Sequence, residues 1–174
     1  TVKTSGFGVT PEGYDLTFDI LEGKMPEYTI KKNKLNTSGF AEGELVGGNL
    51  ALIYALLGTK YSFDFKDKIL FIEDIGEKFY ALDRMLMSLE LAGVFNKIKG
   101  MIVGGMTLME DEKENMNYEE SFDEFSYRII AERISKYDFP VIFGFPNGHI
   151  YDNRPIIIGA EISMKVGNKV EVKF

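Results

Sequence analysis

The stretch that decides the fold is a run of four apolar residues followed by two acids, Ile69-Leu70-Phe71-Ile72-Glu73-Asp74. A short, continuous apolar run is typical of a strand that is buried on both faces, as in a parallel sheet covered by helices. The apolar positions that come next, from Phe79 to Leu89, recur at helical spacing, and Gly93 is predicted to end that helix. The segment therefore predicts one strand-helix unit of an α/β domain.

The same alternation of strands and helices extends outward along the chain. Two more buried strands are predicted, at residues 101–103, ending at Gly104-Gly105, and at residues 141–143. Helices are predicted for residues 10–21, 50–57 after a Gly47-Gly48-Asn49 turn, and 122–134. Shorter strands are predicted at residues 28–30 and 155–158, and alternating apolar residues around Gly167-Asn168 predict a C-terminal β-hairpin. We expect a mainly parallel sheet with this antiparallel hairpin appended.

Composition excludes several classes of function. The 174 residues suit one domain or two small ones, and the absence of cysteine removes thiol nucleophiles, disulfides and thiolate metal sites. The single histidine, His149, rules out zinc chemistry that needs several imidazoles. A formal net charge of -7 argues against nucleic acid as a partner. No apolar run reaches the roughly 18 residues of a membrane span, so we expect no membrane partner either.

Two charged segments are predicted to be solvated. The basic cluster Lys31-Lys32-Asn33-Lys34 is interpreted as an exposed strand end, with a phosphate-binding patch as the alternative. The acidic segment from Glu110 to Glu124 is predicted to begin as an exposed loop, with a role toward a metal or a cationic partner as its alternative.

Three candidate positions follow predicted strands, where the functional crevice of an open α/β sheet lies: Glu73, Gly104-Gly105 and His149. A buried glutamate that orients one ring nitrogen of a histidine leaves the other nitrogen to act as a base, which is half of a catalytic triad. The structural alternatives are an acid that caps the next helix, a role for which Asp74 is better placed, and a packed or surface histidine.

A nucleophile for this half-site is missing from the sequence pattern. None of the serines stands in the Gly-x-Ser-x-Gly setting of a strained nucleophile elbow. Gly47-Gly48-Asn49 is interpreted as a close-packed turn, with an anion site at the N-terminus of the next helix as the alternative. Gly104-Gly105 does not match the spaced dinucleotide fingerprint, so nucleotide binding by the glycine pairs is a weaker alternative.

Four linked blocks resemble one family, the LD-carboxypeptidases, which includes the microcin C self-immunity peptidases. In order, they are Glu42-Gly43-Glu44-Leu45-Val46-Gly47-Gly48-Asn49-Leu50, Ile69-Leu70-Phe71-Ile72-Glu73-Asp74, Asp83-Arg84-Met85-Leu86 with Leu91-Ala92-Gly93, and Gly144-Phe145-Pro146-Asn147-Gly148-His149. The resemblance covers residues 37 to 160 and corresponds to the second half of the family's proteins.

The resemblance implies a serine peptidase whose N-terminal domain supplies the serine and whose C-terminal domain, of swivelling β/β/α type, supplies the acid and the base. By block matching, Glu73 is the triad acid, His149 is the base, and Asn49 contacts the substrate. It also implies a cytoplasmic homodimer without metal or cofactor. The implied reaction removes the terminal D-amino acid from murein tetrapeptides during peptidoglycan recycling, or cleaves a related conjugate.

On this interpretation the chain divides into a connecting segment, residues 1–36, that leads from an absent N-terminal domain, and a C-terminal domain, residues 37–174. Without the serine, the chain alone is expected to be inactive. The alternative is a non-catalytic α/β binding or interaction module, in which Glu73 and His149 are structural. Two observations together would favour the triad: a hydrogen bond between these two side chains, and the other ring nitrogen of His149 facing an open surface. An inward-pointing, fully packed His149 would favour the module.

Overall fold

The fold is known from a computed structural model that describes residues 10–109 and 122–174. Its elements, in chain order, are α1 (Pro11–Leu21), β1 (Glu27–Ile30), β2 (Gly39–Asn49), α2 (Leu50–Leu56), β3 (Ile69–Ile75), α3 (Phe79–Leu91), η1 (Val94–Asn96), β4 (Gly100–Thr107), α4 (Phe122–Ile134), β5 (Val141–Phe143), β6 (Glu161–Val166) and β7 (Val170–Lys173). The α/β class and the C-terminal hairpin are thereby confirmed. Most of the predicted acidic loop, residues 110–121, lies outside the described residues.

The seven strands form one mixed sheet in the order β1-β7-β6-β2-β3-β4-β5. Strands β2 to β5 are parallel, while β1, β7 and β6 join them through antiparallel pairs. The long strand β2 belongs to both parts, because residues 39–44 pair with β6 and residues 45–49 pair with β3. The sheet therefore has a parallel centre with an antiparallel extension.

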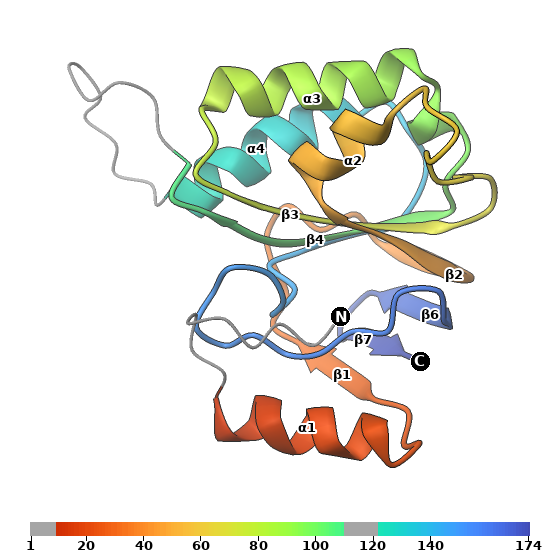
Figure 1. Cartoon of the computed structure of the whole chain (residues 1–174), viewed down its shortest axis with the longest axis vertical. Helices are drawn as coiled ribbons and strands as arrows, with labels where there is room; N and C mark the ends of the chain where they lie inside the picture. Colours follow the sequence, from red (N-terminus) through yellow and green to blue (C-terminus); the bar gives the residue numbers. More distant parts are fainter. Residues whose placement is uncertain (1–9, 110–121) are drawn as a thin grey trace.

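The elements stack in layers (Figure 1). Helices α2, α3 and α4 lie over one face of the parallel strands, and the β6–β7 hairpin, β1 and then α1 lie beyond the other face. Alternation along β3 supplies both cores, because Leu70 and Ile72 join the helix-side core whereas Ile69 and Phe71 join the core next to the hairpin. This is a β/β/α arrangement, in which the parallel strands are buried on both faces.

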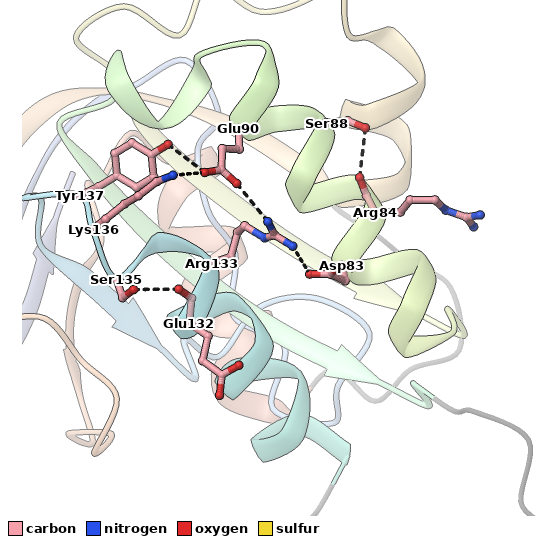
Figure 2. Close-up of polar contacts among 9 residues, drawn as sticks. All are labelled: Asp83, Arg84, Ser88, Glu90, Glu132, Arg133, Ser135, Lys136 and Tyr137. Carbon is pink, nitrogen blue, oxygen red and sulfur yellow. Dashed lines mark hydrogen bonds and ion pairs between the residues drawn. The ribbon is translucent and has the colours of Figure 1, made fainter.

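An ion-pair network joins α3 to α4. Figure 2 shows Arg133 of α4 between two acids of α3, with its Nη2 2.5 Å from Asp83 and its Nη1 3.2 Å from Glu90. Lys136 also pairs with Glu90, and the Tyr137 hydroxyl lies 3.5 Å from the same carboxylate. Asp83 belongs to one of the family blocks, and here its contact holds two helices together.

Two local predictions were wrong. Gly47 and Gly48 were expected to form a turn, but they continue β2 opposite Phe71 and Ile72. A Cβ atom on Gly47 would lie 1.9 Å from the Phe71 carbonyl oxygen, so glycine serves close strand approach there rather than a change of direction. Residues 155–158 were predicted as a strand but form none. Backbone hydrogen bonds to β2 follow this segment: the Gly159 N–H donates to the Leu45 carbonyl, and the Leu45 N–H donates to the Ala160 carbonyl.

None of the helices within residues 10–109 and 122–174 combines the length and the apolar character that crossing a bilayer requires.

Candidate active site

The site begins where the parallel strands end. Glu73 lies near the end of β3 and pairs in register with Asn49, the last residue of β2. Since Phe71 faces the hairpin-side core, strand alternation turns the side chain of Glu73 to that same side. Its neighbour Asp74 is turned to the helices. Glu73 is only 7% exposed, so its carboxylate requires a polar partner.

A β-bulge in β4 lies directly opposite Glu73. Ile72 pairs with Val103 and Asp74 pairs with Met106, so Gly104 and Gly105 together face the single residue Glu73. Bulges of this kind bend a strand and redirect side chains, and they are frequent beside active sites. The prediction that the glycine pair ends the strand was wrong, because β4 continues to Thr107.

The two bulge glycines make room for the loop that carries His149. A Cβ atom on Gly104 would lie 2.3 Å from the Asn147 carbonyl oxygen, and one on Gly105 would lie 2.4 Å from the side chain of Ile150. The Gly105 N–H instead donates to the Asn147 carbonyl oxygen at 3.0 Å. The loop therefore lies directly against β4 and forms a backbone hydrogen bond with it. A side chain at Gly104 or Gly105 would prevent this close approach.

Gly148 brings the same loop against Glu73. Its φ of 124° lies in the range that favours glycine, and a Cβ atom there would lie 3.0 Å from Glu73 Cβ and 3.1 Å from Glu73 Oε2. The preceding Phe145 anchors the loop, because its side chain is 1% exposed in the hairpin-side core and its N–H donates to the Val103 carbonyl.

The result of this packing is a contact between the two predicted triad residues. His149 Nδ1 lies 2.7 Å from Glu73 Oε2, and the two side chains are 14% and 9% exposed. An ionised carboxylate can only accept, so Nδ1 carries the proton in this hydrogen bond. The imidazole is then held in the tautomer whose Nε2 has a lone pair, as general base catalysis requires.

Residues after His149 complete the loop, and the sequence patterns did not single them out. The Asn153 side chain accepts from the Gly148 N–H at 3.2 Å, and the Asn147 side chain donates to the Arg154 carbonyl at 2.6 Å. The Arg154 guanidinium in turn makes two contacts with the Asp152 carboxylate, at 3.0 and 3.1 Å. The density of Asn, Asp and Gly from 147 to 153 was the available signal, since these residues bond to nearby backbone in turns.

Asp74 and Asn49 form a separate polar group on the helix side. Asp74 accepts from Asn49 Nδ2 at 2.8 Å and from the Ala51 N–H at 3.0 Å, while Asn49 Oδ1 accepts from the Leu52 N–H at 3.2 Å. Asp74 was expected to cap the following helix, α3, but it caps the preceding one, α2. Burial raises the pKa of the Asp74 carboxyl, and its hydrogen bonds partly offset that rise.

Asn49 therefore lies beside Glu73 in the sheet while both groups of its amide have partners within the protein. Its predicted contact with substrate stays a prediction. As for metal, the described ranges 10–109 and 122–174 contain no cluster of three or more His, Asp or Glu side chains that could hold an ion.

Comparison with known proteins gives a consistent set of relatives. The family model of the LD-carboxypeptidase C-terminal domain matches residues 42–164. The "probable murein peptide carboxypeptidase" of Bacillus subtilis is 36% identical over 136 residues, which is 77% of this chain and 40% of the relative. The microcin C7 self-immunity protein MccF of Escherichia coli is 26% identical over 133 residues, 76% of this chain and 36% of its own length.

Solved structures show the same fold. The muramoyltetrapeptide carboxypeptidase from Oxalobacter formigenes has a TM-score of 0.79 at 23% identity, covering 99% of this chain and 56% of that one. A structure of MccF has a TM-score of 0.73 at 21% identity, covering 92% and 54%. This chain thus spans about half the length, or less, of these relatives.

Proposed function

The chain belongs to the LD-carboxypeptidase family through its match to the family's C-terminal domain, and we propose that it supplies Glu73 as the acid and His149 as the base of a Ser-Glu-His triad. The observation that carries this proposal is the 2.7 Å contact between His149 Nδ1 and Glu73 Oε2. In a triad the acid fixes the tautomer and orientation of the histidine and stabilises the imidazolium that forms, and a nearly buried carboxylate on Nδ1 fits that role.

The chemistry follows from that contact. His149 Nε2 takes the proton of a serine hydroxyl as its oxygen attacks the scissile carbonyl carbon, and the imidazolium that forms is stabilised by the adjacent Glu73 carboxylate. The imidazolium then gives this proton to the leaving amine, and an acyl-serine remains. Water, activated by the same Nε2, attacks the acyl-serine, and the serine recovers its proton from His149.

In this proposal the serine belongs to an N-terminal domain, and the predicted connecting segment, residues 1–36, joins that domain to the rest of the chain. The substrate is a murein tetrapeptide, and the bond broken is the one to its terminal D-amino acid. Support comes from the names of two relatives, a murein peptide carboxypeptidase and a muramoyltetrapeptide carboxypeptidase. A cytoplasmic location and a homodimer are part of the same proposal.

The test is a chimera in which this chain replaces the matching part of the Bacillus subtilis relative. We expect it to release the terminal D-amino acid from a murein tetrapeptide. In it, Glu73→Gln should lower kcat on the order of 10⁴-fold, because the carboxylate no longer orients and stabilises the imidazole. His149→Ala should lower kcat on the order of 10⁶-fold, because the base is lost.

The matched control is Glu161→Gln, an exposed acid at the start of β6, which should leave kcat unchanged. Near-normal turnover by either site variant would remove the catalytic assignment of that residue and leave it a structural role. The unmodified chain, assayed alone, should show no hydrolysis of the same tetrapeptide, and serine-dependent turnover by it would contradict the assignment of the nucleophile to another domain.

A further inference from the structure

The basic loop Lys31-Lys32-Asn33-Lys34 remains without a role after the site is assigned. It places three positive charges within four residues of a chain whose net charge is -7. Lys24, Lys68, Lys136 and Lys173 each form an ion pair, but among the described residues no carboxylate pairs with the three lysines of this loop. Like charges so close together repel one another unless an anion lies between them.

The backbone of this loop is fixed on the edge of the sheet. Asn33 Oδ1 accepts from the Leu35 N–H at 2.9 Å, and Asn36 Oδ1 accepts from the Phe143 N–H at 2.8 Å. Thr37 then exchanges two hydrogen bonds of 3.1 Å with Val141 of the edge strand β5. The lysines therefore extend from an ordered loop, so little backbone entropy would be lost when a ligand binds.

The loop forms one wall of a cavity of about 330 Å³. Residues 31–35 line it together with Phe143 and Gly144 at the end of β5 and with Glu124 and Tyr127 of α4. Gly144 leaves the space beside Asn33 open, because a Cβ atom there would lie 4.0 Å from Asn33 Nδ2. Neither Glu73 nor His149 belongs to the lining, so this cavity is separate from the triad residues.

The polar groups on the wall are mainly donors. The three ammonium groups and the Asn33 amide can all donate, whereas the Tyr127 hydroxyl is already committed to the Gly104 carbonyl at 2.9 Å. Glu124 contributes the one carboxylate among the lining residues that the structure describes. Among the described lining residues, three cations face one anion, which gives them together a net charge of about +2.

We propose that this cavity binds a small multivalent oxyanion, either a phosphate ester or a polycarboxylate. Lysine binds such groups as a point charge with freely rotating donors, and the flexible stems allow the three ammonium groups to converge on one ligand. Leu35, which is partly exposed, provides apolar contact for the ligand's carbon skeleton. The negative charge elsewhere on the chain favours this cavity over other surfaces for an anion.

The experiment is a titration of the isotope-labelled chain with sodium phosphate and, separately, with sodium citrate, at constant ionic strength. We expect saturable shifts of the backbone amide signals of residues 31–36 and 143–144, with a Kd on the order of 1 mM for the better ligand. The order of the two affinities tells a phosphate site from a polycarboxylate site.

Two variants with the same change in net charge test where the anion binds. Lys31→Gln/Lys32→Gln/Lys34→Gln should raise the Kd at least about tenfold, because the converging charges are lost. The control, Lys60→Gln/Lys165→Gln/Lys169→Gln, removes three exposed lysines outside the cavity lining and should change the Kd less than about twofold. Shifts in the unaltered chain that do not saturate, or an equal weakening by both variants, would overturn the proposal.

Discussion

Replacing Gly148 by alanine tests directly how the backbone brings Glu73 and His149 together. The new Cβ atom would lie 3.0 Å from Glu73 Cβ and 3.1 Å from Glu73 Oε2, in a backbone conformation with φ at 124°. Backbone strain at such a position costs about 1–3 kcal/mol, and overpacking costs a similar amount. If the loop keeps its place, the free energy of unfolding should fall by about 3 kcal/mol.

The loop can also relieve the strain by moving away from β3, and then the hydrogen bond is lost instead. The single imidazole of the chain makes this loss measurable. In the unaltered chain the His149 Nδ1 proton should exchange slowly with water and give its own NMR signal, because Glu73 accepts it in a nearly buried setting. Gly148→Ala should remove that signal, as Glu73→Ala does.

Substitutions at two other glycines distinguish the effect of backbone strain from the effect of crowding. Gly159 has φ at 90°, and a Cβ atom placed there would have no atom within 4 Å. Gly159→Ala should therefore lower the free energy of unfolding by the strain alone, about 1–2 kcal/mol, and keep the His149 signal. The backbone of Gly104 lies outside the left-handed region, but a Cβ atom there would lie 2.3 Å from the Asn147 carbonyl oxygen. Gly104→Ala should therefore disturb the loop by crowding alone. A Gly148→Ala chain that keeps both the signal and the stability of Gly159→Ala would refute the packing described here.

Three further outcomes are expected from urea unfolding. Asp74→Ala should lower stability by about 2 kcal/mol, because Asn49 Nδ2 and the Ala51 N–H lose their acceptor. Burial raises the pKa of Tyr28 from its ordinary 10.0 to about 12. The unaltered chain should therefore lose about 2 kcal/mol of stability between pH 10 and 12 relative to Tyr28→Phe, because the unfolded tyrosine ionises more readily there than the folded one. Arg133→Met should lower stability slightly at low salt and hardly at all in about 1 M NaCl, because the ion pairs between α3 and α4 are partly exposed.

Most of the fold could be predicted because apolar periodicity reports burial directly. Leu70 and Ile72 face one core and Phe71 faces the other, and a continuous apolar run is what such a strand needs. Glycine was the harder residue to interpret. Gly47 and the Gly104-Gly105 pair were expected to end or turn strands, but they lie inside β2 and β4, where neighbouring backbone or, at Gly105, the Ile150 side chain comes too close for a further side chain.

The site was predictable in part for the same physical reason. Glu73 and His149 each follow an apolar run, and parallel strands bring their carboxyl ends to one edge of the sheet. The bulge opposite Glu73 depends on pairing between β3 and β4, which sequence spacing does not report. The helix capped by Asp74 was predicted wrongly for a similar reason, because α2 and β3 meet only in the folded chain.

The two adjacent acids show how the sheet assigns separate tasks to similar side chains. Alternation along β3 turns Asp74 toward the helices, where backbone N–H groups and the Asn49 amide solvate its carboxylate. It turns Glu73 to the opposite face, where the bulge and Gly148 bring its carboxylate against the imidazole of His149. Because Asp74 is satisfied by fixed donors on the helix side, it does not compete for His149, and Glu73 is the carboxylate that holds the imidazole.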